Sequence, residues 1–203
     1  PQLGRQVTQY LQNHPRVFSV LVQGYGNEEV ALQCGVVLRS YARHAELVEA
    51  FLKTSLIFDL IRHSRTSSMD ISADALFSLR EVLLGHKDVS GPWLEANAEK
   101  FFAGFNGLLS SDDYVLQRQA LTLLAGIFLD RHFQKAMLAY VSDDRNLKIN
   151  MNLLLEPSNV LRYDAFQVFK VFAANPKKPR RVQMILYKNK QGLVKILEGI
   201  QAP

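Results

Sequence analysis

The sequence has very little cysteine, because Cys34 is its one thiol among 203 residues. An internal disulfide is therefore excluded, as is a structural zinc site built on thiolates. No uncharged apolar run reaches the 18 residues that a membrane-spanning helix needs. The first ten residues also lack the basic start and apolar core of a signal peptide. These absences predict a cytoplasmic protein that does not insert into a membrane.

The motifs of common enzymes are missing as well. There is no G-x-S-x-G around a serine, no G-x-x-x-x-G-K for phosphate, no H-E-x-x-H and no EF-hand loop. The five histidines are scattered, and Cys34 lies within an apolar stripe, where an inert buried thiol is expected. We therefore expect no catalytic residues, no metal, no cofactor and no small-molecule substrate. A hydrolase has no constellation of residues to support it.

Composition is ordinary for a folded chain. Hydrophobic residues make up 48% and charged residues 21%, so most of the chain should fold. The net charge of +5 suits an acidic protein partner, a nucleic acid or an anionic surface equally well.

Four segments repeat one pattern, in which a small residue leads an apolar stripe with helical spacings of three and four. The small residues are Gly35, Ala75, Ala120 and Ala165, which stand 40, 45 and 45 positions apart. These intervals lie within the ~40 to 47 residues typical of HEAT and armadillo repeats. The stripes continue with Val36, Leu38 and Arg39; Leu76, Leu79 and Val82; Leu121, Leu124 and Ile127; and Phe166, Phe169 and Phe172.

Further helices are expected between the stripes, and no alternating apolar and polar run indicates a strand. They are expected at residues 16–25, 46–63, 93–109, 133–141, 146–154 and 182–197. Asn27, Asp70, Asp113 and Ser158 stand where a short polar side chain can cap a stripe helix. The sequence therefore predicts an all-α, armadillo/HEAT-like helical repeat solenoid of paired helices. We expect one domain over residues 1–203, with about four to five units.

A solenoid presents a long concave surface, so binding a macromolecule is expected of it more than catalysis. The run Lys177 to Arg181 is the densest positive patch and could contact phosphates. A solvated loop between helices is the simpler interpretation of that run. A nucleic-acid-binding repeat protein is thus the alternative function, although no aromatics alternate with the basic residues as in an RNA-stacking surface.

Much of the chain resembles one family in register and without insertions. The resemblance rests on Asp113-Tyr114-Val115 with Arg118-Gln119, Leu129-Asp130-Arg131-His132, Asn146-Leu147-Lys148, Met151-Asn152-Leu153-Leu154, Asp164-Ala165-Phe166, Val168 to Phe172, Ala174-Asn175-Pro176, Gly24-Tyr25, Glu29 to Gly35, Leu38-Arg39, Arg43-His44, Asp70-Ile71 and Asp74-Ala75. In these residues the chain is similar to the mouse-protein-25 scaffolds, also named calcium-binding protein 39. Family members carry additional helices before the position of Pro1, so a truncated or divergent member is expected.

The resemblance implies a non-enzymatic scaffold that binds a Sterile-twenty-type kinase or a related pseudokinase in its active-like conformation. In animals such scaffolds support a ternary complex with a liver-type tumour-suppressor kinase. The positions matching the concave kinase contact are Tyr114 and Arg118. Met69 also matches that contact, where the family usually has phenylalanine, and Gln134 replaces another aromatic.

The resemblance also implies a pocket for a Trp-Glu-Phe peptide from the partner's tail, with Arg131, Lys148 and Met151 at the matching positions. Helical spacing is compatible with both roles, because residues three or four apart share a face. Spacing alone equally allows Arg118 to cover its own helix with its aliphatic stem. It also allows Met151 to be a core residue.

Overall fold

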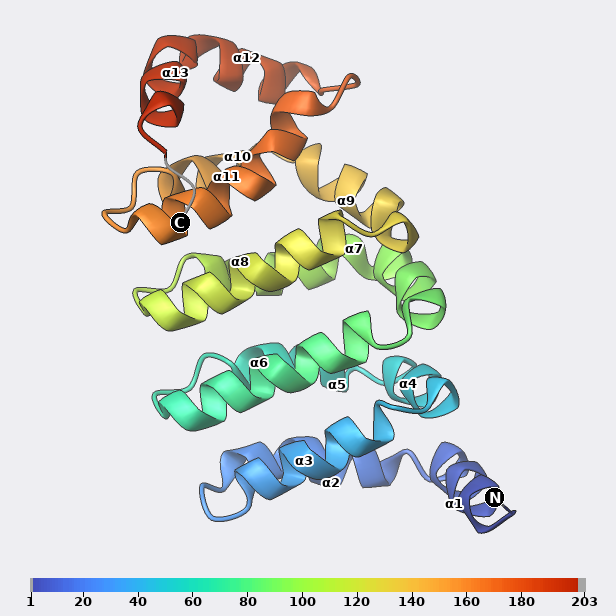
Figure 1. Cartoon of the computed structure of the whole chain (residues 1–203). Coiled ribbons are helices and arrows are strands. Elements are labelled where there is room, and N and C mark those ends of the chain that lie inside the picture. The colour runs from blue at the N-terminus through green and yellow to red at the C-terminus, as the bar shows by residue number, and fades with distance from the viewer. Residues whose placement is uncertain (1, 201–203) are drawn as a thin grey trace. The chain divides into compact units, whose positions relative to one another are not determined.

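The computed structural model describes residues 2–200 of the chain, with side chains from residue 8 onward, and these residues form helices and turns without a strand. The predicted all-α fold is confirmed (Figure 1). Residue 1 and residues 201–203 of the predicted domain lie outside the described part. The helices are α1 Gln2–Asn13, α2 Arg16–Gln23, α3 Ala31–Tyr41, α4 Ala45–Leu52, α5 Leu56–His63, α6 Met69–Leu84, α7 Lys87–Leu109, α8 Tyr114–Phe128, α9 Gln134–Val141, α10 Asp144–Leu153, α11 Asn159–Ala174, α12 Arg180–Lys188 and α13 Lys190–Glu198, with short 3-10 turns η1 Gly24–Gly26 and η2 Arg131–Phe133.

The chain divides into two compact units, Pro1–Asn97 and Ala98–Pro203, and α7 belongs to both. In the first unit the long helices α3 and α6 pack side by side, while α2 and α5 pack against each other and against α3 and α6 respectively. The helix α1 packs on α4. Two successive groups of three helices therefore build this unit in layers, because each helix buries its apolar side against the next group.

The second unit repeats the arrangement. The long helices α8 and α11 pack side by side, α10 packs against α11, and α9 contacts both α8 and α10. The helix α12 then packs on α10. The helices α3, α6, α8 and α11 carry the four predicted stripes, which confirms the repeat period.

Most stripe residues are buried as the pattern predicted, whereas Arg39 and Phe166 are half-buried and Val36 is exposed. Leu79, Leu124 and Phe172 are fully buried, as the interior face of a repeat requires. Val36 is 62% exposed, so its assignment to the core was wrong. Val36 shares its side of α3 with Leu32, four residues earlier, which is also exposed, so this side of the helix faces solvent.

Two long helices expected from the sequence are each broken in two. The expected helix over residues 46–63 is interrupted after Leu52, where Thr54 Oγ1 donates to the Phe51 carbonyl and accepts from the amide of Leu56. The expected helix over residues 182–197 is interrupted at Asn189, whose Nδ2 donates to the Ile185 carbonyl at 2.8 Å. Short polar side chains compete here with the helical hydrogen bonds of the backbone. The groups α1–α3, α4–α6 and α9–α11 each contain three helices where pairs were predicted, whereas α7 and α8 form a pair.

The helix α7 starts six residues before the predicted Trp93 and passes through Pro92. Proline lacks an amide, so one helical hydrogen bond, to the carbonyl of Asp88, is missing. Pro92 is the sixth residue of the helix, close to the end where amides are unpaired anyway. The predicted start of this helix at Trp93 was therefore wrong.

Two of the four predicted caps are confirmed. Asp113 Oδ1 accepts from the amides of Val115 and Leu116 at 2.8 and 3.1 Å, and Ser158 Oγ accepts from Leu161 at 3.4 Å. Asn27 and Asp70 were wrong as caps. Asn27 closes a turn by accepting from the amide of Glu29, four residues before α3 begins, and Asp70 lies inside the first turn of α6.

Candidate protein-binding surfaces

The predicted kinase-contact residues Tyr114 and Arg118 lie on α8 in the second unit, one helical turn apart and both exposed. Tyr114 is the first residue of the helix and is 42% exposed. Its position is set by Asp113, which caps the helix through two backbone amides. A tyrosine and an arginine on one exposed face are the side chains most enriched at binding hot spots. The face consequently has the chemistry of a protein contact.

Arg118 has a neighbour that the sequence did not indicate. Its Nε lies 3.4 Å from Oδ2 of Asp164 on α11, and the Arg118 side chain is still 52% exposed. Arg118 therefore does more than cover its own helix with its aliphatic stem, because its guanidinium also pairs with Asp164. Because the pair is half-exposed, water and salt screen it and it contributes little to stability. The ion pair instead orients Arg118, because Asp164 fixes the direction in which the exposed guanidinium points.

Met69 lies in the first unit, at the start of α6, and is 63% exposed. Phe77, two helical turns further on, is 46% exposed and carries the guanidinium of Arg39 4.8 Å from its ring centre. The exposed methionine and phenylalanine on one helix form an apolar surface of the first unit. Arg39, which lies over Phe77, also pairs with Asp74 and so links α3 to α6 beneath this surface.

The predicted tail-peptide residues are brought together only in part. Lys148 and Met151 lie one turn apart on α10, where Lys148 is exposed and Met151 half-buried. Arg131 is exposed in the turn η2, and Gln134 is the exposed first residue of α9. An open hollow of about 680 Å³ adjoins Lys148, and neither Arg131 nor Met151 lines it. Its walls are Ala139, Ser142, Asp143, Asp144, Arg145, Lys148 and Arg181.

Lys148 is already paired with an acidic neighbour. Its Nζ lies 2.7 Å from Oδ2 of Asp144, one turn earlier on α10, and this hydrogen bond lowers the pKa of the Asp144 carboxyl. The hydrogen bond from Arg145 likewise lowers the pKa of Asp143, which also caps α10 through the Arg145 amide at 2.8 Å. A peptide carboxylate must therefore compete with Asp144 for Lys148.

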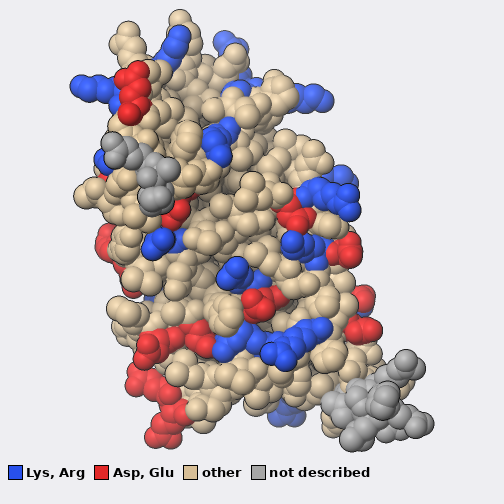
Figure 2. Space-filling view, in the orientation of Figure 1, with Lys and Arg blue, Asp and Glu red and all other residues tan. Residues whose placement is uncertain are grey.

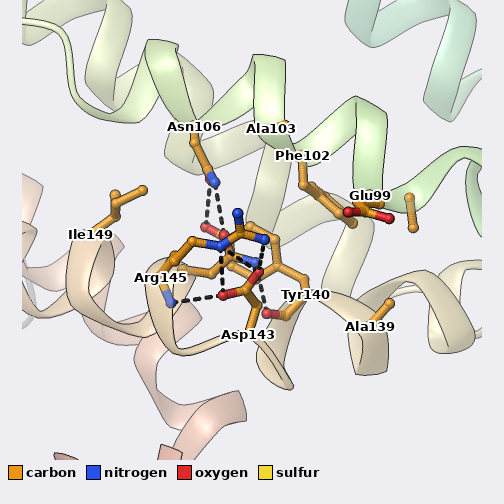
Figure 3. Close-up of a pocket in the computed structure, with 11 residues that line it drawn as sticks. Glu99, Phe102, Ala103, Asn106, Ala139, Tyr140, Asp143, Arg145 and Ile149 are labelled. Atoms are coloured by element: carbon orange, nitrogen blue, oxygen red, sulfur yellow. Dashed lines mark hydrogen bonds and ion pairs between the residues drawn. The ribbon is translucent and has the colours of Figure 1, made fainter.

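A second hollow, of about 420 Å³, lies in the second unit between α7, α9 and α10 (Figure 3). Asn106 Nδ2 donates to Asn146 Oδ1 at 2.7 Å, and Tyr140 Oη donates to Asn106 Oδ1 at 3.3 Å. At its edge Arg145 donates from Nε to Oδ1 and from Nη2 to Oδ2 of Asp143. Burial raises the pKa of Tyr140, which stays neutral. The polar floor is satisfied internally, and none of the predicted site residues lines this hollow.

In the basic run after α11, Lys177 to Arg181, two of the four cations interact with neighbouring groups of the protein. Lys178 Nζ donates to the Asn175 carbonyl at 2.6 Å, and Arg181 Nη1 lies 4.0 Å from Asp144 Oδ1. Charged side chains of both signs mix over the face in Figure 2. Residues 177–179 are the loop that the simpler interpretation predicted, whereas Arg180 and Arg181 begin α12.

Taken together, the stacked three-helix groups define a helical repeat protein of the armadillo class. A designed armadillo repeat protein has the same fold, with a TM-score of 0.61 and 16% identity, over 96% of this chain and 78% of that one. The Mo25-like family model matches residues 2–203, and the chain belongs to that family.

Relatives at 37–40% identity cover nearly the whole chain. They are the degreening-related gene dee76 protein of Auxenochlorella protothecoides (40%, 96% of this chain), calcium-binding protein 39-like of Mus musculus (37%, 95%) and the Mo25-like protein of Schizosaccharomyces pombe (37%, 94%). The chain spans 61%, 57% and 58% of their respective lengths.

The described residues contain no helix long and apolar enough to span a bilayer. Within the same residues, no three His, Cys, Asp or Glu side chains gather closely enough to hold a metal ion.

Proposed function

We propose that this chain is a non-catalytic scaffold that binds a Sterile-twenty-type kinase or a related pseudokinase and captures its Trp-Glu-Phe-like tail. In the second unit the kinase contact uses Tyr114 and Arg118, and in the first unit, by itself, Met69 is the proposed kinase contact. The tail contact uses Lys148 and Met151, with Arg131 at its edge. A liver-type tumour-suppressor kinase is the expected third member of the complex.

The observation that carries the proposal is the exposed pair on α8. The cap at Asp113 fixes the backbone where Tyr114 begins its helix, and Asp164 orients the guanidinium of Arg118, so the two residues are positioned before a partner arrives. Ordering in advance lowers the entropy that binding must overcome. Membership of the Mo25-like family supports a scaffold role for such a surface.

A scaffold of this kind needs no chemistry of its own. It activates a kinase by binding the active conformation more tightly than the inactive one, which shifts the population. About 1.4 kcal/mol of differential affinity is enough for a tenfold shift. The fold also has a precedent for peptide capture, since the designed armadillo repeat protein of the same fold is in complex with the peptide (KR)4.

The test compares kinase affinity and tail-peptide affinity in the same variants. Arg118→Ala should weaken binding to a Sterile-twenty-type kinase domain by about 1 to 4 kcal/mol, as for a hot-spot arginine. The affinity for an isolated peptide ending in Trp-Glu-Phe should be unchanged. Arg65→Ala, which removes an exposed arginine from the loop before α6, is the matched control and should change neither. An unaltered kinase affinity in Arg118→Ala removes the α8 site.

A further inference from the structure

The positive charge of this protein is concentrated at one end of the sequence. Residues 177–203 hold seven of the 24 Lys and Arg residues but only one of the 19 Asp and Glu, a net charge of +6. The preceding 176 residues, with 17 basic and 18 acidic side chains, carry a net charge of −1. The whole net charge of +5 therefore originates in α12, α13 and the loop that leads into them.

These cations are available for binding. Among the described residues none of Lys177, Arg180, Lys188, Lys190 and Lys195 has an ion-pair partner. The side chain of Arg181 is 86% exposed, although it lies at the limit of an ion pair with Asp144. Figure 2 shows Lys and Arg side chains over the part of the second unit where Figure 1 places α12 and α13.

The outward face of α12 adds apolar side chains to this charge. Val182 faces the protein and is fully buried, whereas Met184 and Tyr187 are 46% and 79% exposed. Arg180, Met184 and Tyr187 follow at spacings of four and three, so they share the face opposite Val182. On α13, Leu193 is buried while Val194 is 47% exposed. Each helix thus packs by one side and exposes apolar groups between its cations.

This combination matches an anionic bilayer more closely than other acidic partners. The cations spread over two helices and a loop, as a plane of charge requires, and do not converge on one point. Tyrosine is enriched at the level of lipid headgroups, and long basic side chains extend from there toward phosphates. A single exposed tyrosine gives no row of stacking platforms for RNA. An acidic peptide would need a desolvated anchor pocket, and the face of α12 is open.

We propose that the outward face of α12 and α13 is a peripheral binding site for anionic membrane surfaces. Arg180, Lys188, Lys190 and Lys195 contact headgroup phosphates and carboxylates, while Met184 and Tyr187 enter the interfacial layer. The attachment is reversible and involves no spanning segment. It is independent of the kinase contact proposed on α8.

The experiment measures co-sedimentation of the full chain with lipid vesicles. One set is neutral phosphatidylcholine, and the other contains about 30% phosphatidylserine, whose negative surface attracts basic segments. We expect binding to the anionic vesicles only, and loss of that binding as salt shortens the Debye length from about 10 Å at 0.1 M to about 3 Å at 1 M. Binding to neither set overturns the proposal.

Variants separate a defined face from overall charge. Arg180→Gln with Lys188→Gln should weaken binding about 25-fold, since each cation near the surface contributes about fivefold. The matched control, Arg62→Gln with Arg65→Gln, removes the same charge from exposed residues of the first unit and should leave vesicle binding within about twofold. An equal loss in the control overturns the proposal, because net charge alone would then explain the attachment.

The apolar contribution is tested with Tyr187→Ser, which should weaken binding several-fold at unchanged charge. Leu129→Ser, at an 88% exposed leucine after α8, should not. Circular dichroism melting checks that each variant folds, and if Tyr187→Ser does not, the charge pair decides. A 20-nucleotide single-stranded RNA serves as competitor. Displacement of the protein from vesicles at substoichiometric RNA identifies a nucleic-acid face and overturns the proposal.

Discussion

Arg39 on α3 and Asp74 on α6 form a two-point ion pair, in which Nη2–Oδ1 and Nη1–Oδ2 are both 2.8 Å. The side chains of Arg39 and Asp74 are 16% and 14% exposed. Tyr25 Oη donates to the same Asp74 Oδ2 at 2.8 Å, and Ser78 Oγ accepts from Arg39 at 2.7 Å. The network joins successive repeats of the first unit beneath the exposed Phe77. The network fills the space beside Gly35, so no side chain fits at that position.

Gly35→Ala should destabilise the first unit strongly. A Cβ at Gly35 would lie 1.8 Å from Asp74 Oδ2 and 2.6 Å from Tyr25 Oη, so the network must separate. We expect a loss of about 3 kcal/mol of unfolding free energy, from overpacking and the disturbed ion pair together. Gly192→Ala is the control, because nothing lies within 4 Å of its Cβ, and it should stabilise α13 by up to about 1 kcal/mol. Urea unfolding measures both, and equal stability of the two variants contradicts the network.

Removal of single partners from this network should follow an order. Asp74→Ala leaves the nearly buried Arg39 without its counter-charge and should cost about 3 to 5 kcal/mol. Tyr25→Phe removes only a hydroxyl, whose pKa burial raises and which stays neutral, and should cost about 1 kcal/mol. Thermal and urea unfolding of both variants give the comparison. A larger loss for Tyr25→Phe would show that the ion pair is not the main component.

Met151→Ala distinguishes a pocket wall from a core residue. If Met151 contacts the tail, the variant should lose about 1 to 3 kcal/mol of binding to a Trp-Glu-Phe peptide. Lys148→Ala should lose less, because Lys148 is exposed and already paired with Asp144, and its effect should shrink with salt. Calorimetric titration measures both affinities.

Thermal unfolding of Met151→Ala is the necessary companion measurement. Truncation of a fully buried methionine costs about 2 to 5 kcal/mol of stability, and a half-buried one should cost less. A large loss of stability with normal peptide affinity in the folded fraction would assign Met151 to the core.

His63 should make stability depend on pH near neutrality. Burial, followed by the charge of Arg62, lowers the pKa of this histidine below its ordinary 6.5. The unfolded chain therefore takes up the proton first as pH falls, so the contribution of His63 is complete above about pH 6.5 and is lost as pH falls through the folded pKa. Urea unfolding at successive pH values should show this decline, and His63→Gln should remove it. A decline that persists in the variant assigns it to other groups.

Local patterns in the sequence determined the helical class, the four stripe helices and the caps at Asp113 and Ser158. They could do so because a helix buries residues at spacings of three and four, and a cap acts within three residues of itself. The same patterns failed at Thr54 and Asn189, where a side-chain hydrogen bond interrupts an otherwise continuous amphipathic run.

Tertiary structure alone decided which polar groups meet. Arg118 and Asp164 are 46 positions apart and Arg39 and Asp74 are 35 apart, and neither distance in sequence predicts the contact. Each pair depends on the register in which one repeat stacks on the next, and the packing of whole apolar faces sets that register. The same stacking buried Val182 and turned Met184 and Tyr187 outward. Periodicity specifies a buried face, but the neighbours of the opposite face exist only once the repeats are assembled.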